Sequence, residues 1–168
     1  MEIKLEVCHV SLEVNVDFDQ FTQIFEQYLG RFDQTMIEEL EPYPQSVEDR
    51  LNKAAGEEGL MLFNIQDHGK LLSMLGNPAK AKQYVLGNPL IAATMTRRDI
   101  RAGLYAPLRI FVYESNKSTR IDYDLPSSLF GQFNNDDITT VAKSLDSKLT
   151  NLICKTEHLA KENASGLG

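Results

Sequence analysis

Apolar and polar residues alternate at the start of the chain and predict a β-strand. The segment "IKLEVCHVSLEVNV", residues 3–16, places an apolar side chain at every second position, but the phase of the alternation changes between Val7 and Cys8. Successive side chains of a strand point to opposite faces of the sheet. The change therefore indicates either a β-bulge or a strand covered on both faces, and a bulge near Val7 and Cys8 is the simpler interpretation.

A helical pattern of aromatic residues follows this strand. Asp17 is a suitable N-cap, and Gln20, three residues later, completes a predicted capping box. Apolar side chains then recur at spacings of three and four residues along one helix face, at Phe18, Phe21, Phe25 and Leu29. This face predicts a part of the hydrophobic core, with the wall of a ligand pocket as the alternative.

The middle of the chain predicts a short helix and then several strands. Residues 30–44 form a connection, because Pro42 and Pro44 prevent a continuous helix. Ser46 is the predicted N-cap of a short helix that ends at Gly59. A helical turn or two after residue 69 leads to a tight turn at Gly76. Strands are predicted in four segments: residues 60–69, which end at Gly69, and residues 82–87, 107–114 and 119–126.

A long amphipathic helix is the clearest element of the sequence. Residues 136–161 carry an apolar stripe that includes Ile138, Leu145 and Leu149, with Asp136 and Asp137 in the first turn, where the helix dipole favours negative charge. The element order predicts an α+β fold, in which the C-terminal and N-terminal helices cover an antiparallel sheet of about five strands.

Length and composition predict one soluble domain over residues 1–168. Its expected parts are an N-terminal strand–helix extension (1–44), a core (45–162) and a frayed tail (163–168). The net charge of −7 disfavours nucleic acid and anionic membranes as partners, and no apolar run reaches the roughly 20 residues of a membrane span. Cys8 and Cys154 show no metal-binding spacing. We expect both to be buried in a cytoplasmic protein, and we expect no metal site.

Three separated segments resemble a known family. They are "GNPLIAATM", "GLYAPLRIFVYE" and "IDYDLPSSLFGQF", and they contain Gly87-Asn88-Pro89, Pro107 and the acidic strand Asp122 to Pro126. In this order they are similar to the domain-of-unknown-function 302 family, over about residues 45–155. The resemblance implies a helix-grip-like α+β fold in β-α-β4-α order and, as in relatives, dimers. The family has no established reaction or cofactor.

Two groups of residues are candidates for acid–base chemistry. His68 follows Asp67 at a strand end, and Asp122 and Asp124 share one face of a later strand. An enzyme that uses His68 with these two carboxylates is one hypothesis. The structural alternatives are a turn at Asp67-His68 and a solvated outer strand. Ser127 and Ser128 lack the motif of a hydrolase nucleophile and fit a helix cap better.

A turn and a basic cluster together suggest an anion site. Gly87-Asn88-Pro89 precedes a helix start, whose N–H groups can bind an anion, with Arg97 or Arg101 two turns on. The competing interpretation is a plain turn followed by Pro in the first helical position, which we favour. Arg97 and Arg98 diverge on a helix, so the cluster resembles a solvated face or a partner rim.

The favoured hypothesis is a non-catalytic module that binds a small apolar or anionic ligand and self-associates as a dimer. A groove between the sheet and the long helix is expected to carry the ligand. Its predicted lining is Phe18, Phe25, Tyr84, Tyr105, Phe111 and Tyr123. The candidate ligand-binding residues are Tyr84, Asn88, Tyr105, Arg109, Tyr123 and His68.

Overall fold

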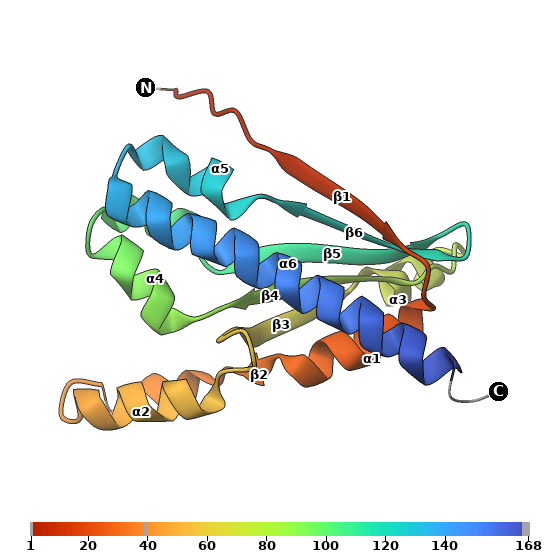
Figure 1. The fold of residues 1–168 in the computed structure, drawn as a ribbon, viewed down its shortest axis with the longest axis horizontal. Coiled ribbons are helices and arrows are strands. Elements are labelled where there is room, and N and C mark those ends of the chain that lie inside the picture. Colours follow the sequence, from red (N-terminus) through yellow and green to blue (C-terminus); the bar gives the residue numbers. More distant parts are fainter. Residues whose placement is uncertain (1, 39, 166–168) are drawn as a thin grey trace.

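A six-stranded sheet forms the centre of the computed structural model, which describes residues 2–38 and 40–165. The strand order is β1-β6-β5-β4-β3-β2, and every neighbouring pair is antiparallel except β2 and β3, which are parallel (Figure 1). The strands are β1 (His9–Val14), β2 (Gly30–Arg31), β3 (Met61–Asp67), β4 (Ala81–Gly87), β5 (Leu108–Ser115) and β6 (Ser118–Asp124).

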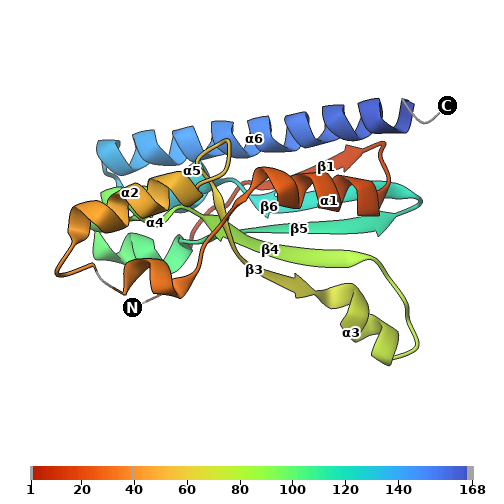
Figure 2. The same cartoon turned by 90° about the horizontal axis from the view of Figure 1, so that it is seen from below.

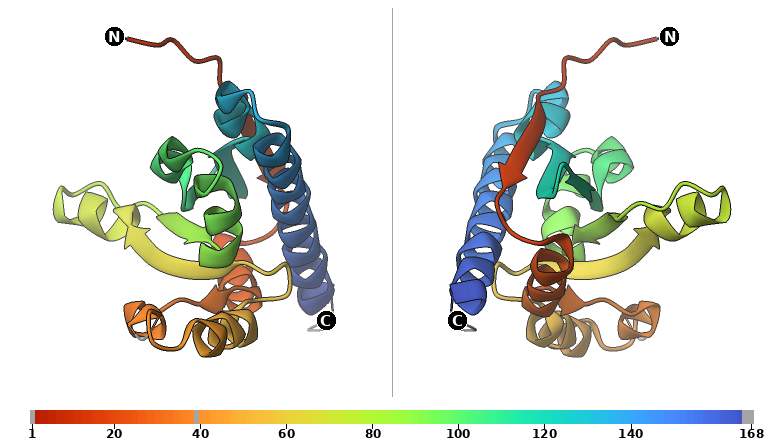
Figure 3. Two further views of the ribbon diagram at one scale, coloured as in Figure 1. Left: turned by 90° about the vertical axis from the view of Figure 1, so that its left-hand side faces the viewer. Right: turned by 90° about the vertical axis from the view of Figure 1, so that its right-hand side faces the viewer.

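Helices cover one face of this sheet (Figures 2 and 3). The longest, α6 (Asp136–Ser165), runs across the strands beside α1 (Phe18–Tyr28). The other α-helices are α2 (Pro44–Ala54), α3 (His68–Met74), α4 (Pro89–Thr96) and α5 (Pro126–Phe130). Short 3-10 segments are η1 (Gln34–Ile37), η2 (Ile100–Tyr105) and η3 (Gly131–Phe133).

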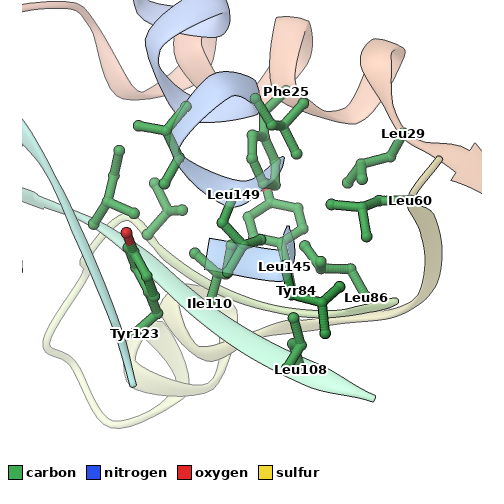
Figure 4. Packing of buried hydrophobic residues seen from close by; sticks show 14 of the residues in the cluster. Phe25, Leu29, Leu60, Tyr84, Leu86, Leu108, Ile110, Tyr123, Leu145 and Leu149 are labelled. Atoms are coloured by element: carbon green, nitrogen blue, oxygen red, sulfur yellow. The ribbon is translucent and has the colours of Figure 1, made fainter. Parts of the chain in front are cut away.

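The core fills the space between α6, α1 and the sheet (Figure 4). Alternation along β5 buries Ile110 and Val112 against the helices and leaves Arg109 in solvent, as its sequence predicts. All four members of the predicted aromatic stripe are buried, and α6 contributes Leu145 and Leu149 from the opposite side. Each such side chain contributes roughly 1.5–3 kcal/mol, and the predicted α+β arrangement of helices on a sheet is confirmed.

The N-terminal strand is shorter than its sequence predicts, and the expected bulge near Val7 and Cys8 is wrong. Pairing begins at His9 opposite Asp124, and the β1–β6 register contains no shift. The partner strand turns into α5 at Pro126, so the residues before Cys8 have no strand to pair with. The phase change therefore marks the end of the β1–β6 ladder. A register shift does occur in another pair, β3 and β4, between Leu62 and Asn64.

Several predicted helix caps are wrong because another residue takes the role. Proline at the first helical position sets the start of α2 at Pro44, two residues before Ser46. Similarly, α5 begins at Pro126, and Ser127 and Ser128 lie inside it. The amide of Gln20 donates to the carbonyl of Ala160 in α6 instead of closing a capping box.

Two further expectations are corrected. Strand β3 ends at Asp67, whose side chain accepts from the N–H of Lys70 and caps α3, so Gly69 lies in a helix and does not end a strand. Cys8 and Cys154 are exposed, because Cys8 precedes the edge strand and Cys154 lies on the outer side of α6.

Candidate functional site

A cavity of about 400 Å³ lies beside α4, at the end of the sheet where β4 finishes and β5 begins. This volume is within the usual range of small-molecule sites. Its walls come from α4, the β4 and β5 ends, η1, α5 and α6. The lining residues are Phe32, Gln34, Phe63, Gly87, Asn88, Pro89, Ile91, Ala92, Ala93, Met95, Thr96, Ala106, Pro107, Leu108, Phe130 and Leu145.

Local sequence explains why α4 stands where it does. Pro89 occupies the first helical turn, and the side-chain oxygen of Asn88 accepts from the N–H groups of Leu90 (2.8 Å) and Ile91 (3.4 Å). The Asn88 amide also donates to the carbonyl of Gly59 at 2.7 Å. Asn88 therefore fixes the start of the helix and ties it to the loop before β3.

Small side chains on one face of α4 create the space. Pro89, Ala92, Ala93 and Thr96 lie three and four residues apart, so they share the face that lines the cavity. The opposite wall carries Phe32 and Phe63, whose stacked rings have centroids 4.4 Å apart. Alanine side chains end at Cβ, and the gap between them and the aromatic pair is left unfilled.

The chemistry of the lining is apolar. None of the described lining residues carries a charge. The Asn88 amide is used by backbone groups, and the Thr96 hydroxyl donates to the carbonyl of Ala92 at 3.1 Å. The side-chain amide of Gln34 is the lining group that is left to orient a bound molecule. The site can hold an uncharged apolar group, and it offers no acid, base or nucleophile.

Most of the predicted groove lining lies in packed core instead. Phe18, Phe25, Tyr84 and Tyr123 are buried where α1 and α6 meet the sheet, and the seam around Tyr84 is filled with side chains (Figure 4). The Tyr84 hydroxyl donates to the Glu26 carboxylate at 2.8 Å. Burial, and then this carboxylate, raise the pKa of Tyr84 far above its ordinary value.

Tyr105 and Arg109 line another hollow of about 300 Å³, which also contains Asp124 and shares Pro107 and Leu108 with the cavity. Tyr105 meets the rings of Phe130 and Phe133 edge-on, at centroid distances of 6.1 and 6.2 Å. Of the six candidate ligand-binding residues, Tyr105 and Arg109 therefore line one hollow together. Asn88 is the single candidate of the six that lines the cavity.

The basic cluster does not converge on one point. Arg98 pairs with Asp137 at 2.7 Å and Arg101 pairs with Asp99 at 2.6 Å, while Arg97 is exposed. The Arg101 guanidinium also lies 5.6 Å from the centroid of the Phe133 ring. The side chain of Asn88 already occupies the first N–H groups of α4, so this region does not form an anion clamp.

The acid–base candidates are also separated. The imidazole of His68 packs edge-on against Phe111, and its buried Nε2 has no hydrogen-bond partner among the described residues. Within the described part of the chain, no hydrogen bond or ion pair joins His68 to Asp122 or Asp124. His9, which sequence reasoning missed, lies 3.1 Å from Asp124 through Nδ1.

Ser11 and His9 do not form a nucleophile and base pair. The Ser11 hydroxyl donates to Asp122 at 2.6 Å, while His9 lies 3.1 Å from Asp124 through Nδ1 and 4.0 Å from Asp122 through Nε2. Among the described residues, no hydrogen bond joins Ser11 to His9. Nucleophilic catalysis needs a base within hydrogen-bond reach of the hydroxyl. Within residues 2–38 and 40–165, no group of three His, Cys, Asp or Glu side chains is placed to hold a metal, and no helix has the length and apolar character to cross a membrane.

The fold and the cavity define a class: α+β proteins in which helices cover one face of a largely antiparallel sheet and an uncharged cavity opens at one end. The chain belongs to the DUF302 family, a domain of unknown function, whose pattern matches residues 38–156. This match confirms the resemblance seen in the sequence. Among curated proteins, none matches the chain.

A solved structure has the same fold. The crystal structure of an uncharacterised conserved DUF302 protein from Bacillus stearothermophilus is similar with a TM-score of 0.64 and 16% sequence identity. The similarity covers 88% of this chain and 97% of that chain. At this identity the comparison establishes the fold alone.

The cavity could have been found from signals that the sequence analysis used for the family resemblance and for a candidate anion site. Gly87-Asn88-Pro89 and Pro107, which belong to two separate family signatures, both line it. The alanine pair Ala92-Ala93, inside the first of these signatures, was the additional clue. The aromatic wall was not accessible in this way, because Phe32 and Phe63 come from segments whose pairing the sequence does not reveal.

Proposed function

We propose that this protein is a non-catalytic module that binds a small apolar molecule in the cavity beside α4. The observation that carries the proposal is the lining itself: about 400 Å³ bounded by aromatic, aliphatic and small uncharged side chains. Binding sites for small molecules are mostly apolar and contain few polar groups. The absence of a converging acid, base and nucleophile among the described residues supports binding over catalysis.

A fluorescent-probe binding assay tests this function. The neutral probe N-phenyl-1-naphthylamine is expected to gain fluorescence with the protein and to raise its melting temperature, because a ligand of the native state stabilises it. The variant Ala92→Leu fills the cavity and is expected to abolish the fluorescence gain. Ala164→Leu, on an exposed position of α6, adds the same side chain away from the cavity and should bind normally.

The stability of Ala92→Leu separates a filled cavity from a damaged fold. Filling a cavity typically adds about 0.5–2 kcal/mol to the free energy of unfolding, so this variant should melt no lower than wild type. Probe binding that is unchanged in Ala92→Leu, or no probe binding by wild type at all, would count against the proposed site.

Self-association is the second function that we propose, and one surface supports it. Leu71, Met74 and Leu75 are 61%, 82% and 81% exposed at the end of α3, which stands away from the other helices (Figure 2). Contiguous exposed apolar side chains mark interaction sites in soluble proteins. A dimer that buries the end of α3 against the same surface of a second chain would explain why these apolar side chains are exposed in one chain.

The two exposed, unpaired cysteines favour a reducing compartment such as the cytoplasm.

A further inference from the structure

A second hollow adjoins the cavity on the other side of α4. It has a volume of about 480 Å³ and is lined by residues of α2, α4 and α6. Ile91 and Leu145 line both spaces, so the two spaces meet at these side chains. The residues that line the second hollow are Glu48, Asn52, Leu90, Ile91, Thr94, Thr140, Val141, Ser144, Leu145 and Lys148.

Helix α4 is apolar around its circumference, yet it is incompletely covered. Met95 is its one fully buried described residue. Its small face borders the cavity, while Leu90, Ile91 and Thr94 border the second hollow. Apolar helices of soluble proteins are normally buried on all sides. An apolar occupant that extends beneath α4 would supply the missing cover on both sides.

The two spaces differ in charge. The cavity has no charged lining, whereas the second hollow contains Lys148 and Glu48 together with the polar side chains of Asn52 and Ser144. Thr140, Ser144 and Lys148 follow one another at four-residue intervals along α6. The walls of the second hollow are otherwise largely apolar, so a molecule that occupies both spaces meets charged side chains at one end only.

Lys148 has an unneutralised charge in this arrangement. Its Nζ donates to the backbone carbonyl of Glu58 at 2.7 Å. Among the described residues it makes no ion pair, so its charge is held in place by a neutral acceptor and two of its N–H donors remain available. A negatively charged head group is the complement to this ammonium in the second hollow.

We propose that the two spaces form one site for a single-chain amphiphile with a carboxylate head group. The hydrocarbon chain occupies the cavity, passes Ile91 and Leu145, and presents the carboxylate to Lys148. This inference rests on the ligand site proposed above and specifies the ligand class. Glu48, the other charged residue of the hollow, opposes the carboxylate and lowers its affinity.

Displacement of N-phenyl-1-naphthylamine by three probes of equal chain length tests the head group. The probes are dodecanoate, dodecanol and dodecylammonium, each below its micellar concentration. Dodecanoate is expected to bind most tightly. Lys148→Met should weaken dodecanoate about fivefold or more, because charge-assisted hydrogen bonds are stronger than neutral ones, and it should leave dodecanol unchanged. Lys148→Arg should keep the preference, and Lys143→Met, an exposed position of the same helix, should have no effect.

The same measurements separate failure of the head-group assignment from failure of the cavity. If dodecanol equals dodecanoate, or if Lys148→Met and Lys143→Met behave alike, the carboxylate inference is overturned and the cavity remains. Tighter dodecylammonium binding that Glu48→Gln abolishes would overturn it in favour of a cation. If wild type binds none of these probes, both proposals fail.

Discussion

At the residue scale, Asn88 connects two segments that the sequence keeps apart. Its oxygen caps α4, and its amide holds the carbonyl of Gly59. We expect Asn88→Ala to lower the free energy of unfolding by about 1–3 kcal/mol, because a cap and a hydrogen bond are lost together. Asn88→Ser, which retains only a cap, should recover part of the loss. Urea denaturation measures both, and equal midpoints for Asn88→Ala and wild type would contradict the prediction.

The contribution of Tyr84 to the free energy of unfolding is expected to fall at alkaline pH. Burial and Glu26 raise the pKa of Tyr84 above its ordinary value of 10.0. A group with a raised pKa in the folded state stabilises it fully below the unfolded pKa, and this contribution is lost as pH rises. Wild type should therefore exceed Tyr84→Phe in unfolding free energy at about pH 8, and the difference should shrink at about pH 11. A difference that is constant with pH would contradict the assignment.

At this scale, periodicity predicted the burial of strand and helix side chains, whereas the burial of Cys8 and Cys154 and the hydrogen-bond partners were not predicted. Alternation in β5 correctly assigned Ile110 and Arg109 to opposite faces. Caps failed where proline supplied a better start, as at Pro44. Gln20 bonds to Ala160, and His9 meets Asp124 across 115 residues of sequence. Such partners depend on the packing of distant elements, which one-dimensional spacing does not encode.

At the element scale, α6 closes the core, so a charge on its buried face should be costly. Leu145 is almost completely buried. Leu145→Asp should lower the free energy of unfolding by about 3 kcal/mol or more, since a carboxylate loses its hydration there. Ser147→Asp places the same group on an exposed position of the helix and should change stability little. Equal melting temperatures for the two variants would show that α6 is misplaced.

Two glycines allow the segments beside β2 to cross. A Cβ on Gly56 would lie 2.2 Å from the carbonyl oxygen of Tyr28, and one on Gly30 would lie 1.9 Å from that of Ala54. Gly56→Ala should therefore destabilise the protein markedly, because the clash moves backbone and not a flexible side chain. Gly131→Ala is the matched control, because nothing lies within 4 Å of its Cβ. Thermal denaturation that ranks the two variants in the opposite order would contradict this crossing.

Long, strongly periodic elements were predicted correctly, and so was the short strand β4, whereas the two-residue strand β2 was missed. The amphipathic stripe of α6 and the hairpin of β5 and β6 carry enough repeats to define their period. Strand β2 contains only Gly30 and Arg31 and pairs in parallel with β3. Two residues are too few to show an alternating pattern in the sequence. The cavity depends on this missed strand, because Phe32, which directly follows it, forms part of the aromatic wall.

At the scale of the whole molecule, the apolar tip of α3 predicts the oligomeric state. We expect light scattering to give twice the 19.0 kDa mass of one chain. Replacing Leu71, Met74 and Leu75 together by serine should yield a folded single chain. The pair Ile100→Ser and Leu104→Ser is the control, because both residues are similarly exposed but lie on η2. A monomeric wild type contradicts self-association, and an unchanged dimer in the triple variant contradicts this interface.

The alanine face of α4 allows ligand size to change independently of the fold. The remaining walls of the cavity belong to the sheet, to α6 and to the stacked pair Phe32 and Phe63, all of which also hold the protein together. Ala92 and Ala93 belong to neither hydrophobic core cluster, so longer side chains at these positions would narrow the cavity and leave the fold intact. Evolution could thus select bulkier or slimmer molecules through a single helical turn.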